Sequence, residues 1–287
     1  MASTSSSAPP ERTCAHCHKA ASQLEPAVKL MRCSACKVVF YCSREEQTLD
    51  WKRHQPACLS RRHAEPYIAH IDFGRSTTDH SPWFEPVFDA ITPERSFVTV
   101  ANSAELRSLL SHPILPSAIL STTAALAEKQ HANVRAALRI YIEKGGRVVV
   151  GGPGIGHLMM DEIPVLLSEL GGVPWQVGGY HRTTHYLNTS HPLYRAVDSP
   201  ARAALSASFS CKAIVLKEVD PSDMVYRSTG DSGVESLAMA MGGGKVASDE
   251  VAVATAQVGE GWLSWVGDVN QEAGSTAAML WLLGVKR

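Results

Sequence analysis

The chain has 287 residues, enough for two domains or one large one, and its 45% hydrophobic and 19% charged residues are an ordinary globular balance. Its formal net charge of −1 gives no reason to expect a polyanionic partner for the chain as a whole. No uninterrupted apolar run approaches the roughly 18 residues of a membrane span, and the opening MASTSSSAPP lacks the apolar core of a signal peptide. We therefore expect an intracellular protein, of the cytoplasm or nucleus, without a membrane partner.

A cluster of cysteines follows a polar Ser/Ala/Pro tail. Six of the seven cysteines lie between residues 14 and 58, and only Cys211 lies outside. In a reducing compartment, clustered cysteines favour a metal over disulfides. Residues 11–62 also carry ten Lys and Arg against five Asp and Glu, which we interpret as cations that offset metal-bound thiolates. The expected organisation is a disordered tail over 1–10 and a metal-binding domain over 11–60.

The spacing of the cluster is typical of zinc sites. Two Cys-x2-Cys pairs, a fifth cysteine and a His-x3-Cys pair supply the candidate ligands, which are Cys14, Cys17, Cys33, Cys36, Cys42, His54 and Cys58. Each short spacing lets two side chains reach one tetrahedral ion. A segment of about 45 residues has too little apolar surface to fold unaided, so the metal would supply folding energy.

This stretch resembles the MYND-type zinc finger, with FYCS around the fifth cysteine, then Asp50-Trp51, Arg53-His54 and the closing Cys58. The resemblance implies a small cross-braced zinc finger with two Zn²⁺ ions. It assigns one ion to Cys33, Cys36, His54 and Cys58, and the other to Cys14, Cys17, Cys42 and position 46. It also implies contact with a protein or a short peptide, often one containing proline.

Position 46 is a glutamate, so the first zinc site departs from the family pattern. Glu46 could ligate through oxygen, His16 or His18 could substitute, or the site could keep three thiolates and a water. Ser43 and Glu46 also form an S-x-x-E capping box for the next helix, a role that competes with metal binding. We include Glu46 among the predicted ligands and expect two structural zinc ions. Trp51 is expected to pack under the second site rather than to recognise a ligand.

From residue 61 to residue 287 the pattern changes to alternating strands and helices. Strands are expected at 66–73, 96–101, 118–122, 147–152, 211–219, 250–258 and 261–269. Helices are expected at 104–111, 130–144, 155–170 and 274–283, with a kink at Pro164 in the third. Gly259-Glu260-Gly261 suits a hairpin between the last two strands. The order favours an α/β domain with a mostly parallel sheet flanked by helices and an added antiparallel portion.

The stretch GRVVVGGPGIGHLMM resembles class I glutamine amidotransferase-like folds, which include the ThuA-like proteins. Enzymes of that fold place a nucleophilic cysteine at the tip of a Gly-x-Cys-x-Gly-His turn. Here the turn runs from Gly152 to His157, and Gly154 stands at the tip, where it supplies no nucleophile. Ser190-His191-Pro192-Leu193 and the segment from Gly259 to Asn270 fit the same resemblance, which covers roughly residues 66–285.

Other candidate catalytic residues have plainer interpretations. Cys211 is read as a small buried core residue. His181, His185 and His191 lie in a segment with strand character, which would set the first two some 13 Å apart, and a loop or capped-turn role is preferred for them. His157 either lines a pocket or is solvated at a helix start. Asp268 and Glu272 are read as complementing the dipole of the last helix.

The leading functional hypothesis is a zinc-binding protein–protein interaction protein with a non-catalytic amidotransferase-like domain that serves as a scaffold or binds a small ligand. The alternative is a hydrolase or amidotransferase-like enzyme that uses a non-standard nucleophile or an activated water. A lysine methyltransferase is disfavoured because no NH-S-C-type cofactor motif is present. Nucleic acid is disfavoured as a partner because the finger offers only three aromatic residues, which the metal fold is expected to use.

Overall fold

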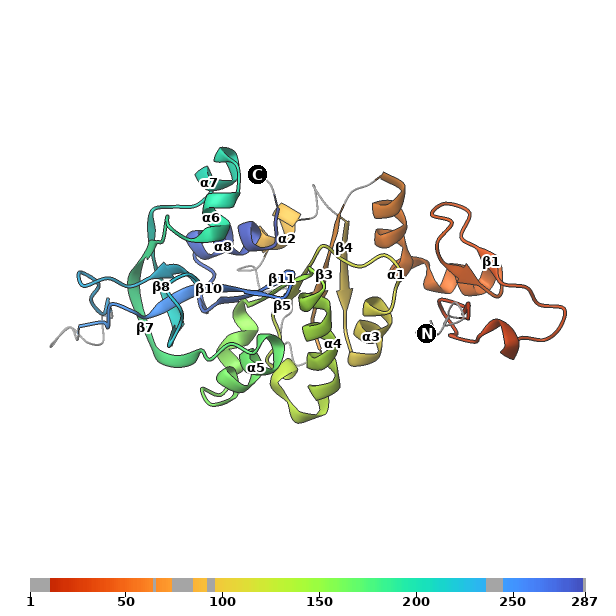
Figure 1. Cartoon of the computed structure of the whole chain (residues 1–287), viewed down its shortest axis with the longest axis horizontal. Helices are drawn as coiled ribbons and strands as arrows, with labels where there is room; N and C mark the ends of the chain where they lie inside the picture. Colours follow the sequence, from red (N-terminus) through yellow and green to blue (C-terminus); the bar gives the residue numbers. More distant parts are fainter. Residues whose placement is uncertain (1–10, 64–65, 74–84, 92–95, 236–244, 286–287) are drawn as a thin grey trace, which may run out of the picture. The chain divides into compact units, whose positions relative to one another are not determined.

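The computed structural model describes residues 11–63, 66–73, 85–91, 96–235 and 245–285 (Figure 1). The tail predicted to be disordered, residues 1–10, lies outside this range. The chain divides into two compact units, one made of residues 1–65 with 112–115 and the other of 66–111 with 116–287.

The first unit is a short hairpin followed by one long helix. Strands β1 (Met31–Arg32) and β2 (Phe40–Tyr41) pair antiparallel, a 3-10 turn occupies Ala21–Gln23, and α1 spans Arg44–His63. The buried core of this unit consists of Cys14, Cys33, Cys36, Val39, Tyr41 and Cys58. Because most of these side chains end in sulfur, hydrocarbon burial contributes little stability here.

The second unit contains one nine-stranded sheet. Its strands are β3 (Tyr67–Ile71), β4 (Ser96–Val100), β5 (Ala118–Ser121), β6 (Arg147–Gly151), β7 (Gln176–Leu187), β8 (Ser208–Lys217), β9 (Met224–Arg227), β10 (Val251–Val258) and β11 (Gly261–Val266). Their order across the sheet is β4-β3-β5-β6-β11-β10-β8-β7-β9. The predicted hairpin between the last two strands is present as the antiparallel pair β10–β11.

The expectation of a mostly parallel sheet is wrong, because the sheet is mixed. Strands β4, β3, β5, β6 and β11 pair in parallel, whereas β11, β10, β8, β7 and β9 pair antiparallel. The long strands β7 and β8 cause the difference, since they pair along ten residues and extend the antiparallel half. Strand β9 also pairs with β10, so this half curls back on itself.

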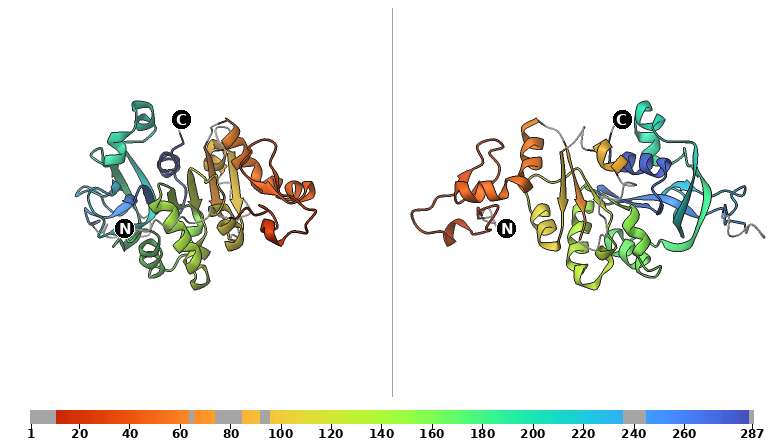
Figure 2. Two further views of the ribbon diagram at one scale, coloured as in Figure 1. Left: turned by 45° about the vertical axis from the view of Figure 1, so that its right-hand side comes forward. Right: turned by 180° about the vertical axis from the view of Figure 1, so that it is seen from behind.

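Helices cover both faces of the sheet (Figure 2). Helices α3 (Ser103–Leu110), α4 (Ala132–Glu143) and α5 (Glu162–Gly171) pack in sequence on one face. Helices α2 (Glu85–Ile91) and α8 (Ala273–Leu282) pack together on the other, and the short helices α6 (Pro192–Ala196) and α7 (Ser199–Ala203) connect β7 to β8. The buried side chains of the parallel strands explain the apolar runs that made these strands readable in the sequence.

The third predicted helix begins later than expected. Residues 153–157 form a 3-10 turn, and α5 begins only at Glu162. Pro164 therefore lies in the first turn of α5, where its missing amide costs no helical hydrogen bond, so no mid-helix kink arises.

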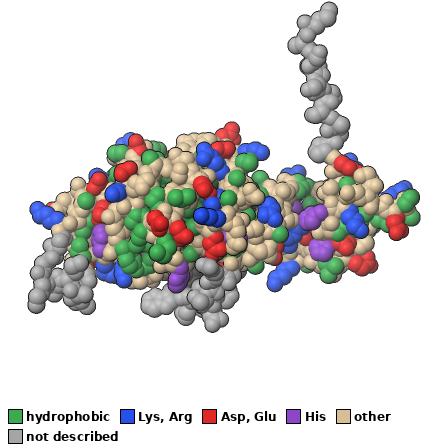
Figure 3. Space-filling view, turned by 90° about the horizontal axis from the view of Figure 1, so that it is seen from below, with side chains coloured by type: hydrophobic (Ala, Val, Ile, Leu, Met, Phe, Trp, Pro, Cys, Tyr) green, Lys and Arg blue, Asp and Glu red, His purple; other side chains and the backbone are tan. Residues whose placement is uncertain are grey.

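Charged side chains of both signs are interspersed over the face shown in Figure 3. Within the described ranges, no helix combines the length and apolar character that crossing a membrane requires.

Candidate metal centre

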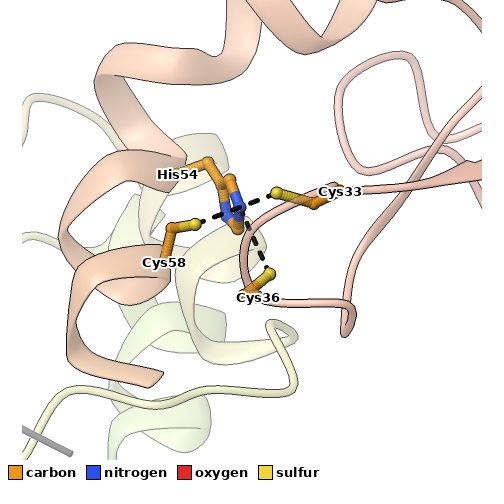
Figure 4. A group of neighbouring side chains, drawn as sticks. All are labelled: Cys33, Cys36, His54 and Cys58. Carbon is orange, nitrogen blue, oxygen red and sulfur yellow. Dashed lines mark hydrogen bonds between the residues drawn. The ribbon is translucent and has the colours of Figure 1, made fainter. Parts of the chain in front are cut away.

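Four predicted ligands converge in the first unit. The ligand atoms of Cys33, Cys36, His54 and Cys58 all lie within 4.8 Å of one another, and all four residues are buried (Figure 4). The Cys33 and Cys58 sulfurs are 3.8 Å apart, and Nε2 of His54 lies 3.6 Å from the Cys36 sulfur. His54 and Cys58 are one turn apart on α1, so the helix presents them on one side toward the knuckle of Cys33 and Cys36.

We call Cys33, Cys36, His54 and Cys58 the second cluster, because they correspond to the second zinc site. The electrostatic surroundings of this cluster favour a bound cation. Burial lowers the pKa of His54 to about 4, which keeps the imidazole neutral and its nitrogen able to ligate at neutral pH. Burial, followed by the charge of Cys36, raises the pKa of Cys58. Thiols this close cannot all ionise without a compensating positive charge, and a metal ion supplies that charge.

Three further thiols, those of Cys14, Cys17 and Cys42, form what we call the first cluster, because they correspond to the first zinc site. The sulfurs of Cys14, Cys17 and Cys42 lie within 4.8 Å of one another, and those of Cys17 and Cys42 are 3.6 Å apart. Burial opposes ionisation of Cys14, but hydrogen bonds from the backbone amides of Cys17, Cys42 and His16 outweigh it and lower the pKa of that thiol. Amides directed at sulfur are typical of groups that stabilise a thiolate.

The two donor sets fit zinc. Three thiolates with one imidazole is a common structural zinc set, and three thiolates already form most of a second tetrahedral site. The two clusters therefore fit two zinc ions, as the spacing predicts.

Glu46 is not a member of the group of ligand atoms formed by Cys14, Cys17 and Cys42. Its carboxylate contacts Nδ1 of His16 at 2.5 Å, and its backbone amide donates to the Ser43 hydroxyl at 3.2 Å. His18, the other substitute considered, is exposed. Ligation by Glu46 thus stays a prediction.

The glycine turn of the second unit leaves no room for a nucleophile. Gly152 has φ +96°, and a Cβ added at Gly154 would lie 1.7 Å from the carbonyl oxygen of Thr122. No side chain fits at the tip unless the backbone moves. His157, at the end of the same turn, is exposed.

The remaining thiol, that of Cys211, is shielded from solvent. Cys211 is fully buried on β8, and burial, followed by the charge of Asp268, raises the pKa of its thiol. Asp268 accepts from the backbone amides of Asn270 and Glu272, so it orders the turn that leads into α8. A buried, protonated thiol is a poor nucleophile.

The three histidines of the middle segment have different surroundings. His191 caps α6, since its Nδ1 accepts from the amide of Leu193, in line with the capped-turn interpretation. A loop role for His181 and His185 is wrong, because both lie on strand β7. They lie four residues apart on this strand, and the groups of three or more potential metal ligands found among the described residues do not include them.

Protonation of His185 is expected to destabilise the second unit. The side chain is fully buried, neither ring nitrogen has a hydrogen-bond partner within the described residues, and burial lowers its pKa to about 4. As the pH falls, the unfolded chain binds the proton first, because its histidine has the ordinary pKa. The contribution of neutral His185 to the free energy of unfolding is therefore fully present above that ordinary pKa and is lost as the pH drops toward the pKa of the folded state. Between pH 7 and pH 5 the loss is about 2 kcal/mol. Urea unfolding at both pH values measures it, and a His185→Phe variant with an equally steep pH dependence would contradict the assignment.

Sequence reasoning missed a groove on the first unit. It has a volume of 570 Å³ and is lined by Met31, Arg32, Ser34, Arg44, Gln47, Thr48 and Trp51. The lining residues from α1 recur at helical spacing, a pattern that could have predicted from the sequence that they share one face of the helix. Trp51 meets the His54 ring edge-on at 6.0 Å, yet it is 38% exposed, so it both packs near the second cluster and lines the groove.

Comparison with known proteins supports the interpretation of the N-terminal part. The MYND finger family model matches residues 14–58. A SET and MYND domain-containing protein of Dictyostelium discoideum is 47% identical over 45 residues. That match covers 16% of this chain and 8% of the relative, so it concerns the finger alone.

Solved structures resemble this chain only distantly. A ThuA-like protein from Bacteroides uniformis (13% identity, TM-score 0.44) covers 78% of this chain and 94% of its own. A ThuA-like protein from Parabacteroides merdae (11% identity, TM-score 0.46) matches over 77% of this chain and 91% of its own length. A β-galactosidase from Bacillus circulans (12% identity, TM-score 0.46) matches over 77% of this chain and 31% of its own length. Scores below 0.5 say nothing of activity or ligand.

Proposed function

We propose, taking residues 14–58 as a MYND zinc finger, that this chain is a zinc-dependent interaction protein whose finger binds a short extended peptide. MYND fingers generally mediate protein interactions. The observation that carries the proposal for this chain is the groove between residues of β1 and α1.

The groove suits a peptide with apolar and acidic residues. Met31 is 50% exposed and Trp51 38%, so an apolar side chain or a proline ring of the peptide would cover them. Arg32 and Arg44 supply positive charge, and no lining residue is acidic. Guanidinium groups bind carboxylates through charge-assisted hydrogen bonds, so an acidic residue beside the apolar one is favoured.

Replacing Trp51 by alanine is expected to weaken peptide binding by roughly 30-fold, since a central aromatic residue typically contributes about 2 kcal/mol. The probe is a labelled decapeptide of proline, leucine and glutamate residues, and fluorescence anisotropy measures its dissociation constant. Arg44→Glu should weaken this peptide and favour a version with lysine in place of glutamate.

Leu49→Ala is the matched control, because Leu49 lies on the same helix, is 67% exposed and does not line the groove. It should leave binding unchanged. Equal losses in the Leu49 and Trp51 variants, or no binding of either peptide, would refute the groove as the binding site.

We also propose that the α/β domain is a non-catalytic scaffold. The closed tip at Gly154 and the buried thiol of Cys211 support this. The alternative, an enzyme with another nucleophile or an activated water, predicts product release from glutamine or acyl esters. Turnover that is lost in Cys211→Ala or His157→Ala would establish that alternative.

A further inference from the structure

The first cluster groups three thiols, and two further potential donors, His16 and Glu46, contact each other. His16 lies between Cys14 and Cys17 in the sequence, and Glu46, in the first turn of α1, lies four residues after Cys42. The contact of 2.5 Å between Nδ1 of His16 and Oε2 of Glu46 joins a knuckle residue to the first turn of α1. The fourth donor of this cluster is therefore to be sought in this pair.

The carboxylate of Glu46 does not take part in capping the helix. The Ser43 hydroxyl accepts from the Glu46 amide, but the Glu46 carboxylate is directed to His16. The neighbouring Glu45 serves the helix start instead, since hydrogen bonds from its own backbone amide and from Ser43 lower its pKa. The competition between capping and metal binding expected from the sequence is thus absent at Glu46.

We propose that Glu46 is the fourth ligand of the first zinc ion through its carboxylate, with His16 as the hydrogen-bonded partner of that carboxylate and not a ligand. Zinc accepts carboxylate oxygen, and ligating carboxylates are themselves hydrogen-bonded. The backbone amide of His16 is directed at the Cys14 sulfur, while its ring is engaged by Glu46.

This ligand set makes the two zinc sites unequal. Three thiolates and a carboxylate leave a net charge of −2 on the first site, whereas three thiolates and a neutral imidazole leave −1 on the second. The excess negative charge and the hard oxygen donor weaken the first site relative to the second. The first ion should therefore be the one that a chelator removes first.

The experiment uses the full chain, with zinc counted by elemental analysis during titration with a chelator. Wild type should release its two ions in two steps. Glu46→Ala should weaken only the first step, by 100-fold or more, and His16→Ala should weaken the same step by a smaller factor, within the roughly 10–100-fold typical of an outer partner. Glu45→Gln, which keeps a hydrogen-bond acceptor at the helix start, is the matched control and should match wild type.

A gain of ligand provides an independent measurement. In the Co²⁺-substituted chain, Glu46→Cys should raise the thiolate-to-metal charge-transfer absorption, since the six coordinating thiolates become seven. A larger loss in His16→Ala than in Glu46→Ala would make His16 the ligand and overturn the proposal. Wild-type behaviour of both variants, or no added absorption in Glu46→Cys, would overturn it as well.

Discussion

Removal of zinc from the full chain is expected to unfold residues 11–63 and to leave the second unit folded. The core of the first unit is mostly cysteine sulfur, so little hydrophobic free energy remains once the thiolates lose their cation. Binding of structural zinc to small fingers contributes an apparent 10–16 kcal/mol, about the whole of their folding energy. The second unit has an extensive aliphatic core of its own. Hydrogen exchange read by mass spectrometry, with and without chelator, separates the two regions.

Two controls make this result specific. Restoring zinc after chelation should restore protection in the finger, whereas magnesium should not, because thiolates select the softer ion. His54→Ala, which removes one buried ligand of the second cluster, should reproduce most of the loss without a chelator. A finger that stays protected while elemental analysis finds no metal would disprove the dependence on zinc.

Gly154→Ala is expected to destabilise the second unit by about 3 kcal/mol or more. The added Cβ would lie 1.7 Å from the carbonyl oxygen of Thr122 and 3.2 Å from Cα of Thr123, and neither backbone group can rotate away as a side chain can. The turn between β6 and α5 or the end of β5 must therefore move. Urea unfolding followed by circular dichroism measures the change.

Gly156→Ala is the control within the same turn. Its Cβ would meet Val269 at 3.6 Å, which is ordinary van der Waals contact, so a change below about 1 kcal/mol is expected. Similar losses in the two variants would mean that general disturbance of the turn, and not the contact with Thr122, sets the cost. Gly154→Cys should be as unstable as Gly154→Ala and should gain no activity.

The paired metal ligands could be predicted from the sequence because the geometry within each pair is local, whereas the grouping of the pairs was implied only by the resemblance. Two residues between cysteines, or one helical turn between His54 and Cys58, fix the distance between donors without knowledge of the rest of the chain. The contact between His16 and Glu46 could not be predicted, because it joins side chains thirty positions apart. The groove required the placement of β1 against α1, which the cysteine spacing does not specify.

The parallel half of the sheet was readable because its strands are buried apolar runs between helices. Strand β7 was recognised only as strand character around His181 and His185 and was not counted in the sheet, because its buried face carries Thr183 and His185 while Tyr180 and Tyr186 are exposed. Polarity on the buried face removes the alternation that identifies a half-buried strand. Without β7, the extent of the antiparallel half was underestimated, and a mostly parallel sheet was expected.

The second pairing of β9 has a consequence for self-association. A terminal strand with unpaired amides and carbonyls can recruit a strand from another molecule, but β9 is flanked by β7 on one side and β10 on the other. Within the described residues, the opposite border, β4, pairs with a single neighbour. Intermolecular strand addition, whether in a physiological dimer or in aggregation, would therefore begin along Ser96–Val100.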